Sequence, residues 1–149
     1  MKAPRELELE ALAAVTTESQ LSLEELAALP AYSGASPNPD CVYDGSLVEL
    51  SFRQPLLADG GELVVSILGP VWDRVFRLEF FGVTGIELSG FGPSLSMDVR
   101  ELVLERLPKG KRCKILALGF PAAITVTYTS VKASRLVLES PLNRSEPGT

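Results

Sequence analysis

Alternation of apolar and polar residues along most of the chain constrains its fold more than any other feature. In residues 46–53, "SLVELSFR", Val48, Leu50 and Phe52 alternate with charged or small polar residues, a pattern typical of a strand with one buried face. Similar segments follow at short intervals, divided by glycine or proline, at residues 62–68, 74–81, 85–91, 113–118, 124–129 and 135–139. Strands at this spacing predict an antiparallel sheet, built as a meander, a sandwich or a partly closed barrel.

One segment of this region fits two structures. Residues 96–107, "SMDVRELVLERL", have apolar residues at a spacing that suits a helix, but the same residues also fit a bulged strand. We favour a strand because the neighbouring segments on both sides are strands.

Four glycines lie close together at positions 82, 85, 90 and 92. A dinucleotide-binding loop needs the pattern G-x-G-x-x-G between a strand and a helix. The spacing here differs, and a strand follows. We therefore interpret these glycines as turn and bulge residues, since glycine takes positive φ angles at little cost.

The first 30 residues have a different character from the rest of the chain. Residues 4–16 are rich in Ala, Glu and Leu and predict a helix, although the alternation at 6–10 also fits a strand. Ser22 and Glu25 form a capping box that predicts a second helix over residues 23–29, before Pro30. Six Glu against Lys2 and Arg5 give residues 1–30 a net charge of −4, whereas thirteen acids against twelve bases give residues 31–149 a net charge of −1.

The chain length of 149 residues suits a single α+β domain, 1–149, with one or two short N-terminal helices on a mainly antiparallel sheet. We divide it into an acidic helical preface (1–30), a proline-rich linker (31–42), a β body (43–139) and a loose tail (140–149). We expect the preface to modulate binding or assembly without being needed for the fold. Its second helix is expected to dock either on its own sheet or on a partner.

The alternating segments also predict which side chains form the interior, because every second residue of a strand points to the same face. The predicted core consists of Val48, Leu50, Phe52, Phe76, Leu78, Phe80, Ile86, Leu88, Ile124, Val126 and Tyr128.

Composition argues against several classes of function. The chain has no histidine, and its two cysteines, Cys41 and Cys113, form no C-x-x-C pair, so we expect no bound zinc, iron or other cofactor. We expect free buried thiols; a disulfide is the alternative. Basic residues are not in excess, and no apolar run approaches the roughly 20 residues needed to span a bilayer. We therefore expect a cytoplasmic protein that binds neither nucleic acid nor membrane.

Three basic residues, Trp72 and its neighbour Asp73 are candidates for binding. Lys109, Lys111 and Arg112 belong to the cluster "KGKRCK", which is either a solvated turn or a site for an anion or an acidic partner. Trp72, beside Asp73 in the loop "GPVWDR", is either a loop anchor packed on the core or part of an interface.

The order of these elements resembles the immunity protein 50 family, whose members neutralise toxins of bacterial polymorphic toxin systems. The segment "YDGSLVELSF" is similar to the family's opening motif, but has Tyr43 and Gly45 where the family has His and Ala. The family pattern L-x-F-x-G-V-x-x-L-x-L-x-G is matched by Leu78, Phe80, Gly82, Val83, Ile86, Leu88 and Gly90. The resemblance covers residues 43–139. It implies a protein-binding domain that is not an enzyme, and within the opening motif it points to Asp44.

Protein binding, with toxin neutralisation as its specific form, is therefore the expected function. One alternative is a small hydrolase that uses carboxylates such as Asp44 and Asp98. Another is a structural homo-oligomer that pairs exposed strand edges.

Overall fold

The computed structural model describes residues 15–57 and 59–138. The predicted tail (140–149) and most of the predicted first helix (4–16) lie outside this range. Residues 15 and 16 of that predicted helix are instead the start of a strand, β1 (Val15–Leu21).

Eleven strands and one helix make up the described part of the chain. Nine strands form one antiparallel sheet: β1, β4 (Gly45–Arg53), β5 (Gly61–Leu68), β6 (Arg74–Val83), β7 (Gly85–Ser89), β8 (Asp98–Arg106), β9 (Lys111–Ala117), β10 (Ala123–Tyr128) and β11 (Ser130–Leu138). The other two, β2 (Tyr32–Ser33) and β3 (Ser36–Pro37), form a small hairpin. The predicted strands are confirmed, including the ambiguous segment 96–107, which contains β8.

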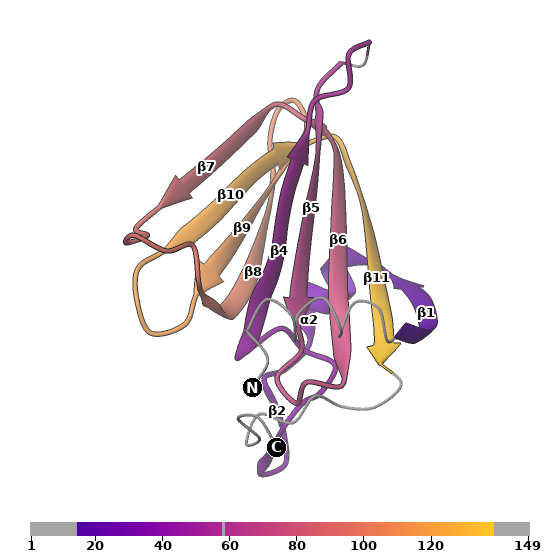
Figure 1. The fold of residues 1–149 in the computed structure, drawn as a ribbon, viewed down its shortest axis with the longest axis vertical. Coiled ribbons are helices and arrows are strands. Elements are labelled where there is room, and N and C mark those ends of the chain that lie inside the picture. Colours follow the sequence, from indigo (N-terminus) through magenta and orange to yellow (C-terminus); the bar gives the residue numbers. More distant parts are fainter. Residues whose placement is uncertain (1–14, 58, 139–149) are drawn as a thin grey trace, which may run out of the picture.

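The strand order is β1-β11-β6-β5-β4-β8-β9-β10-β7, so the sheet is a meander only in part. Strands β4 to β6 and β8 to β10 follow one another, whereas β11 returns beside β6 and β7 lies beside β10. The two parts of the sheet meet where β4 and β8 pair at Gly45–Val99 and Ser46–Asp98. Figure 1 shows β7 to β10 leaning away from the upright strands β4, β5, β6 and β11.

The two halves of the sheet are also joined at a second place, where two stretches of chain bend together from one half into the other. Strand β6 continues into β7 after Thr84, and β10 continues into β11 after Thr129. β6 pairs with β11, and β7 pairs with β10, so the same two stretches of chain are paired in both halves. Gly82 makes the bend possible: its φ is 62°, and a Cβ there would lie 2.5 Å from the Thr129 hydroxyl oxygen.

The inner faces of the two halves enclose one apolar core. Its members come from β5, β6, β8, β9, β10 and β11, and from helix α2 (Leu23–Ala28). Six predicted core residues belong to it: Phe76, Leu78, Phe80, Ile124, Val126 and Tyr128. Leu50 is partly buried against the same core.

Four predicted core residues lie elsewhere. Ile86 and Leu88 are 37% and 43% exposed, because β7 is the last strand of the sheet and no further strand of the described residues lies beside it. Phe52 is 54% exposed near the end of β4, where its ring lies over Gly61. Val48 packs in a second, smaller cluster, because the register of β4 against β5 shifts beside it, between Leu47 and Glu49.

The second helix is confirmed as α2, with Ser22 accepting a hydrogen bond from the Glu25 amide at 3.0 Å. It docks on its own sheet, against β8 and β11, and buries Leu23 and Leu26 in the main core. β1 in turn pairs with β11. Residues 15–28 of the leading segment are thus part of the fold. No helix among the described residues is long and apolar enough to cross a lipid bilayer.

The predicted linker, 31–42, is also packed against the body. It contains the β2–β3 hairpin and ends in Cys41 and Val42, whose exposed fractions are 2% and 4%. Cys41 and Cys113 are both buried free thiols, as expected. Burial raises the pKa of Cys113 to about 12 and also raises the pKa of Cys41.

Candidate functional site

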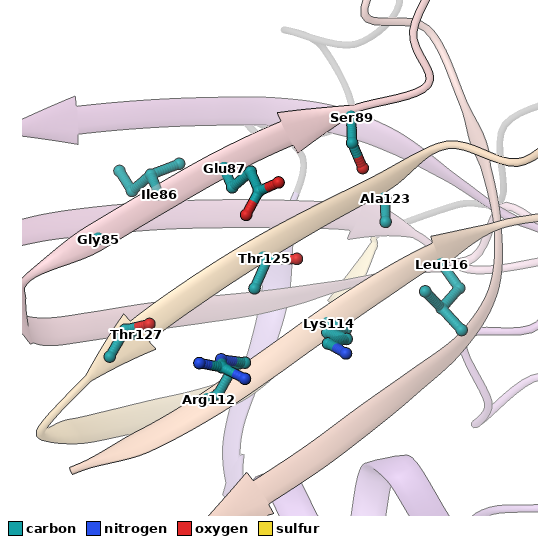
Figure 2. Close-up of a pocket in the computed structure, with 10 residues that line it drawn as sticks. All are labelled: Gly85, Ile86, Glu87, Ser89, Arg112, Lys114, Leu116, Ala123, Thr125 and Thr127. Atoms are coloured by element: carbon teal, nitrogen blue, oxygen red, sulfur yellow. The ribbon is translucent and has the colours of Figure 1, made fainter. Parts of the chain in front are cut away.

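A shallow hollow of about 630 Å³ lies on the outer face of β7, β10 and β9 (Figure 2). Its floor is strand β10, which turns the short side chains of Ala123, Thr125 and Thr127 outward because Ile124, Val126 and Tyr128 point into the core. Side chains on the two neighbouring strands form the walls. They are Glu87 and Ser89 on β7, and Arg112, Lys114 and Leu116 on β9.

The two walls carry opposite charges. Across the hollow, Thr125 is paired with Glu87 on one side and with Lys114 on the other. Arg112 and Lys114 also reach Glu105 of β8, at 3.2 and 3.3 Å. The hydrogen bond from Lys114, more than any other contribution, lowers the pKa of Glu105, so this carboxyl stays ionised well into the acid range.

The hollow borders β7, which no strand of the described residues pairs with on its outer side. Every residue of β7 is exposed, and β7 is the terminal strand in the strand order. An edge strand presents unpaired backbone N–H and C=O groups that an extended segment of another chain can pair with. The hollow and this edge together form a continuous surface suited to polar and main-chain contacts.

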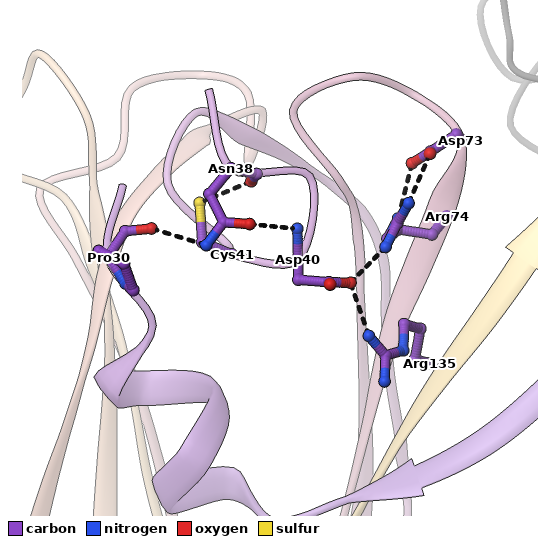
Figure 3. A network of polar contacts seen from close by, with 7 residues as sticks. All are labelled: Pro30, Asn38, Asp40, Cys41, Asp73, Arg74 and Arg135. Atoms are coloured by element: carbon purple, nitrogen blue, oxygen red, sulfur yellow. Dashed lines mark hydrogen bonds and ion pairs between the residues drawn. The ribbon is translucent and has the colours of Figure 1, made fainter. Parts of the chain in front are cut away.

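A second polar group of residues lies at the opposite end of the sheet (Figure 3). Asp40 accepts hydrogen bonds from Arg74, at the start of β6, and from Arg135 of β11, the latter at 2.6 Å. Arg74 also donates two hydrogen bonds to Asp73, at 2.7 and 2.6 Å. Asn38 holds the loop in place, since its side chain accepts from the Asp40 amide and donates to the Pro30 carbonyl.

These contacts change the acid–base behaviour of the group. Burial by itself would raise the pKa of Asp40, but the hydrogen bonds and charges of Arg135 and Arg74 outweigh it and hold that pKa below its usual value of 3.8. The hydrogen bond to Asp73 is the largest of the effects that raise the pKa of Arg74. Asp40 and Arg74 therefore stay charged at neutral pH, and the network fastens the loop 30–41 to the sheet.

Asp40→Asn is expected to lower the free energy of unfolding at pH 7 by about 1 kcal/mol, a modest value because the carboxylate is 38% exposed. Because the pKa of Asp40 is lowered in the folded state, its contribution is present above pH 3.8 and is lost as the pH falls below that value. The difference between wild type and variant, measured by urea unfolding from pH 7 to acid, should shrink with falling pH. The matched control is Asp59→Asn in an exposed turn, which should stay close to wild type at every pH.

The structure separates the residues that the sequence suggested as a binding site. Trp72 and Asp73 lie in the turn between β5 and β6, where Trp72 packs against the second apolar cluster and anchors the loop. Lys109 lies in the β8–β9 turn, whereas Lys111 and Arg112 belong to β9 and not to the turn. Of these residues, Arg112 alone lines the hollow.

Asp44 and Asp98 both lie near the junction of β4 and β8. The Asp44 amide donates to the Val99 carbonyl at 2.7 Å, and the Ser46 hydroxyl donates to Asp98 at 3.0 Å. Neither carboxylate lines the hollow. The described residues contain no group of three or more His, Cys, Asp or Glu placed to hold a metal ion.

Sequence reasoning missed Lys114, Glu87, Thr125 and Thr127 as a group. The alternation in "ITVTYT" predicts that the threonines point outward. It does not predict which strands lie on either side of β10. It also missed Asp40 as the partner of Arg135, which is 95 residues away. Comparison of the chain with models of known families, with curated proteins and with solved structures found no match.

Proposed function

We propose that this chain is a protein-binding domain without catalytic activity, and that toxin neutralisation is the specific form of that function. The observation that carries the proposal is the open hollow with oppositely charged walls beside the free edge of β7. An enzyme site is usually a deep, largely apolar cleft, whereas contact surfaces for proteins are broad and partly polar. The resemblance to the immunity protein 50 family supports the toxin-binding form.

The hollow suits an extended segment of a partner. A strand added to β7 would gain main-chain hydrogen bonds, and its side chains would meet Ile86 and Leu88 on one face and Glu87 on the other. Basic and apolar residues that alternate in the partner would match this edge, because opposite charges across paired strands stabilise the pair.

The test is binding to the protein encoded by the neighbouring gene, because immunity proteins are encoded beside their toxins. Isothermal titration calorimetry and growth rescue on co-expression would measure it. Thr125→Arg fills the floor of the hollow and Lys114→Glu reverses one wall; each is expected to weaken binding about tenfold or more. Arg100→Glu, at an exposed position near the start of β8, is the control and should bind like wild type. If all three variants bind as tightly as wild type, the hollow is not the contact surface.

Self-association is a second candidate, because an exposed apolar edge strand can pair with a second copy. Two β7 strands paired antiparallel about Glu87 would bring two carboxylates together, which disfavours that register. Sedimentation over a range of concentrations distinguishes the candidates: a dimer that Ile86→Lys abolishes would favour self-association over a foreign partner.

A further inference from the structure

The tip of the β4–β5 hairpin is an apolar projection. Among the large apolar side chains of the described residues, Leu56 and Leu57 are the most exposed, at 96% and 98%. We call residues 54–57 and 59–60 the prong. Figure 1 shows the hairpin extending beyond the ends of the other strands, at the top of the view. Single exposed leucines are ordinary, but two adjacent ones at a protruding tip indicate a contact site.

The base of the prong is held in a defined position. The Gln54 side chain donates to the Gly60 carbonyl at 3.3 Å and so closes the neck of the loop. Gly60, with φ of 87°, lies against the backbone of Gly82, where even a Cβ would come within 2.9 Å. The prong is therefore fixed to the corner at which β6 becomes β7.

Basic residues gather at the same end of the molecule. Arg106 pairs with Lys111, Lys111 pairs with Tyr128, and Tyr128 precedes the corner residue Thr129. The β8–β9 turn, which carries Lys109, thus lies beside the corner. We call this end the upper end; its described residues are 52–57, 59–62, 81–85, 105–112 and 127–132.

The charge of the upper end is opposite to that of the remaining chain. It carries six bases against three acids (Asp59, Glu62 and Glu105), an excess of three positive charges. The bases are Arg53, Arg106, Lys109, Lys111, Arg112 and Lys132. The other described residues carry five bases against eleven acids, an excess of six negative charges. A negatively charged surface would therefore attract the upper end and repel the rest, which fixes one orientation.

We propose that the upper end docks on a lipid bilayer that contains anionic lipids. Leu56 and Leu57 enter the boundary between headgroups and acyl chains, and the surrounding Lys and Arg side chains contact the headgroup phosphates. This requires no membrane-spanning segment, so the absence of a long apolar run in the sequence does not bear on it.

Shape and charge together favour a membrane over a folded protein as the occupant. The prong is convex and narrow, and a bilayer surface yields around such a tip, whereas a protein would need a matching cavity. Stable attachment to a membrane takes two weak signals, an apolar insertion and a basic surface, and the upper end has both. Docking in this orientation would leave the Asp40 network, at the far end, facing away from the membrane.

Co-sedimentation of the full chain with phosphatidylcholine vesicles, with and without phosphatidylglycerol, tests the proposal. We expect binding to the anionic vesicles only, and weaker binding as salt rises. The double variant Leu56→Ser/Leu57→Ser should lose about tenfold or more in affinity, since two buried leucines are removed from lipid. Its matched control is Leu95→Ser, an exposed leucine (47%) outside the upper end, which should bind like wild type.

Variants that reverse a charge test the electrostatic part of vesicle binding independently. Lys109→Glu/Lys111→Glu should also lose about tenfold, whereas Arg100→Glu, in the lower half of β8, should have little effect. Equal binding to neutral and anionic vesicles would overturn the electrostatic part. If the leucine double variant binds anionic vesicles as tightly as wild type, the prong does not insert into the bilayer. No vesicle binding at all, with self-association that the double variant abolishes, would overturn the proposal in favour of a second copy.

The buried native thiols allow a direct test of insertion. Cys41 and Cys113 are both buried, so a thiol dye should label Leu57→Cys selectively. A polarity-sensitive dye at this position is expected to shift its emission to the blue on anionic vesicles, whereas the same dye on Leu95→Cys should not. Equal shifts at both positions would contradict insertion of the prong.

Discussion

Phe80→Ala is expected to lower the free energy of unfolding by about 3–5 kcal/mol, the range for removing a fully buried phenylalanine. The Phe80 side chain is 0% exposed, and its ring meets the ring of Tyr128 edge-on at a centroid distance of 4.8 Å. On either side it is paired with Leu63 of β5 and Val131 of β11. Alanine would therefore leave a cavity in the core at the point where β6 and β10 approach each other.

The matched control for this change is the next residue. Phe81→Ala removes the same side chain from the same strand, but Phe81 points to the outer face and is only partly buried. Its cost should be about 1 kcal/mol or less. Urea unfolding of the two variants gives the comparison; equal losses would show that the register of β6 is wrong.

A chain that begins at Pro39 is expected to fail to fold. It lacks β1, which pairs with β11 from Val15 to Leu21, and it lacks α2, whose Leu23 and Leu26 are 2% and 1% exposed in the main core. The sequence alone had suggested that residues 1–30 are dispensable for the fold. The packing of α2 reverses that expectation.

Two point variants in α2 and its cap test the same idea without truncation. Leu26→Ala should cost about 2–5 kcal/mol, as for other buried leucines. Leu29→Ala, at a position 38% exposed, should cost much less. Near-ultraviolet circular dichroism of the shortened chain and urea unfolding of the variants provide the measurements. If the shortened chain has a native spectrum, or if both leucine variants lose the same free energy of unfolding, residues 1–30 are not needed for the fold.

The contrast between β6 and β7 shows how far the sequence predicts this fold. In both strands, alternation correctly predicts a strand and its two faces. It does not reveal whether another strand lies beside it, so Phe76 and Phe80 were placed correctly while Ile86 and Leu88 were not. Burial at a sheet edge depends on strand order, and strand order arises from pairings between distant segments.

The candidate sites also depend on contacts between segments that are distant in the sequence. Arg112 was suggested by its basic neighbours in sequence and does line the hollow. The wall opposite it contains Glu87 of β7, which pairs with β10 although β8 and β9 lie between these two strands in the sequence. Asp40 lies in a segment whose prolines suggested a linker, and no local pattern indicates that it holds Arg74 and Arg135 together.

The corner that β6–β7 and β10–β11 share has a consequence for how the protein folds. Because each of these stretches is paired in both halves of the sheet, neither half can be complete before the other begins to form. Of the described strands, the first in sequence, β1, pairs with the last, β11, so this pairing requires both ends of the described chain. Chains dominated by such distant pairings close long loops early and fold slowly, on the order of milliseconds to seconds. We therefore expect slow folding and a single cooperative unfolding transition, with no stage at which one half persists alone.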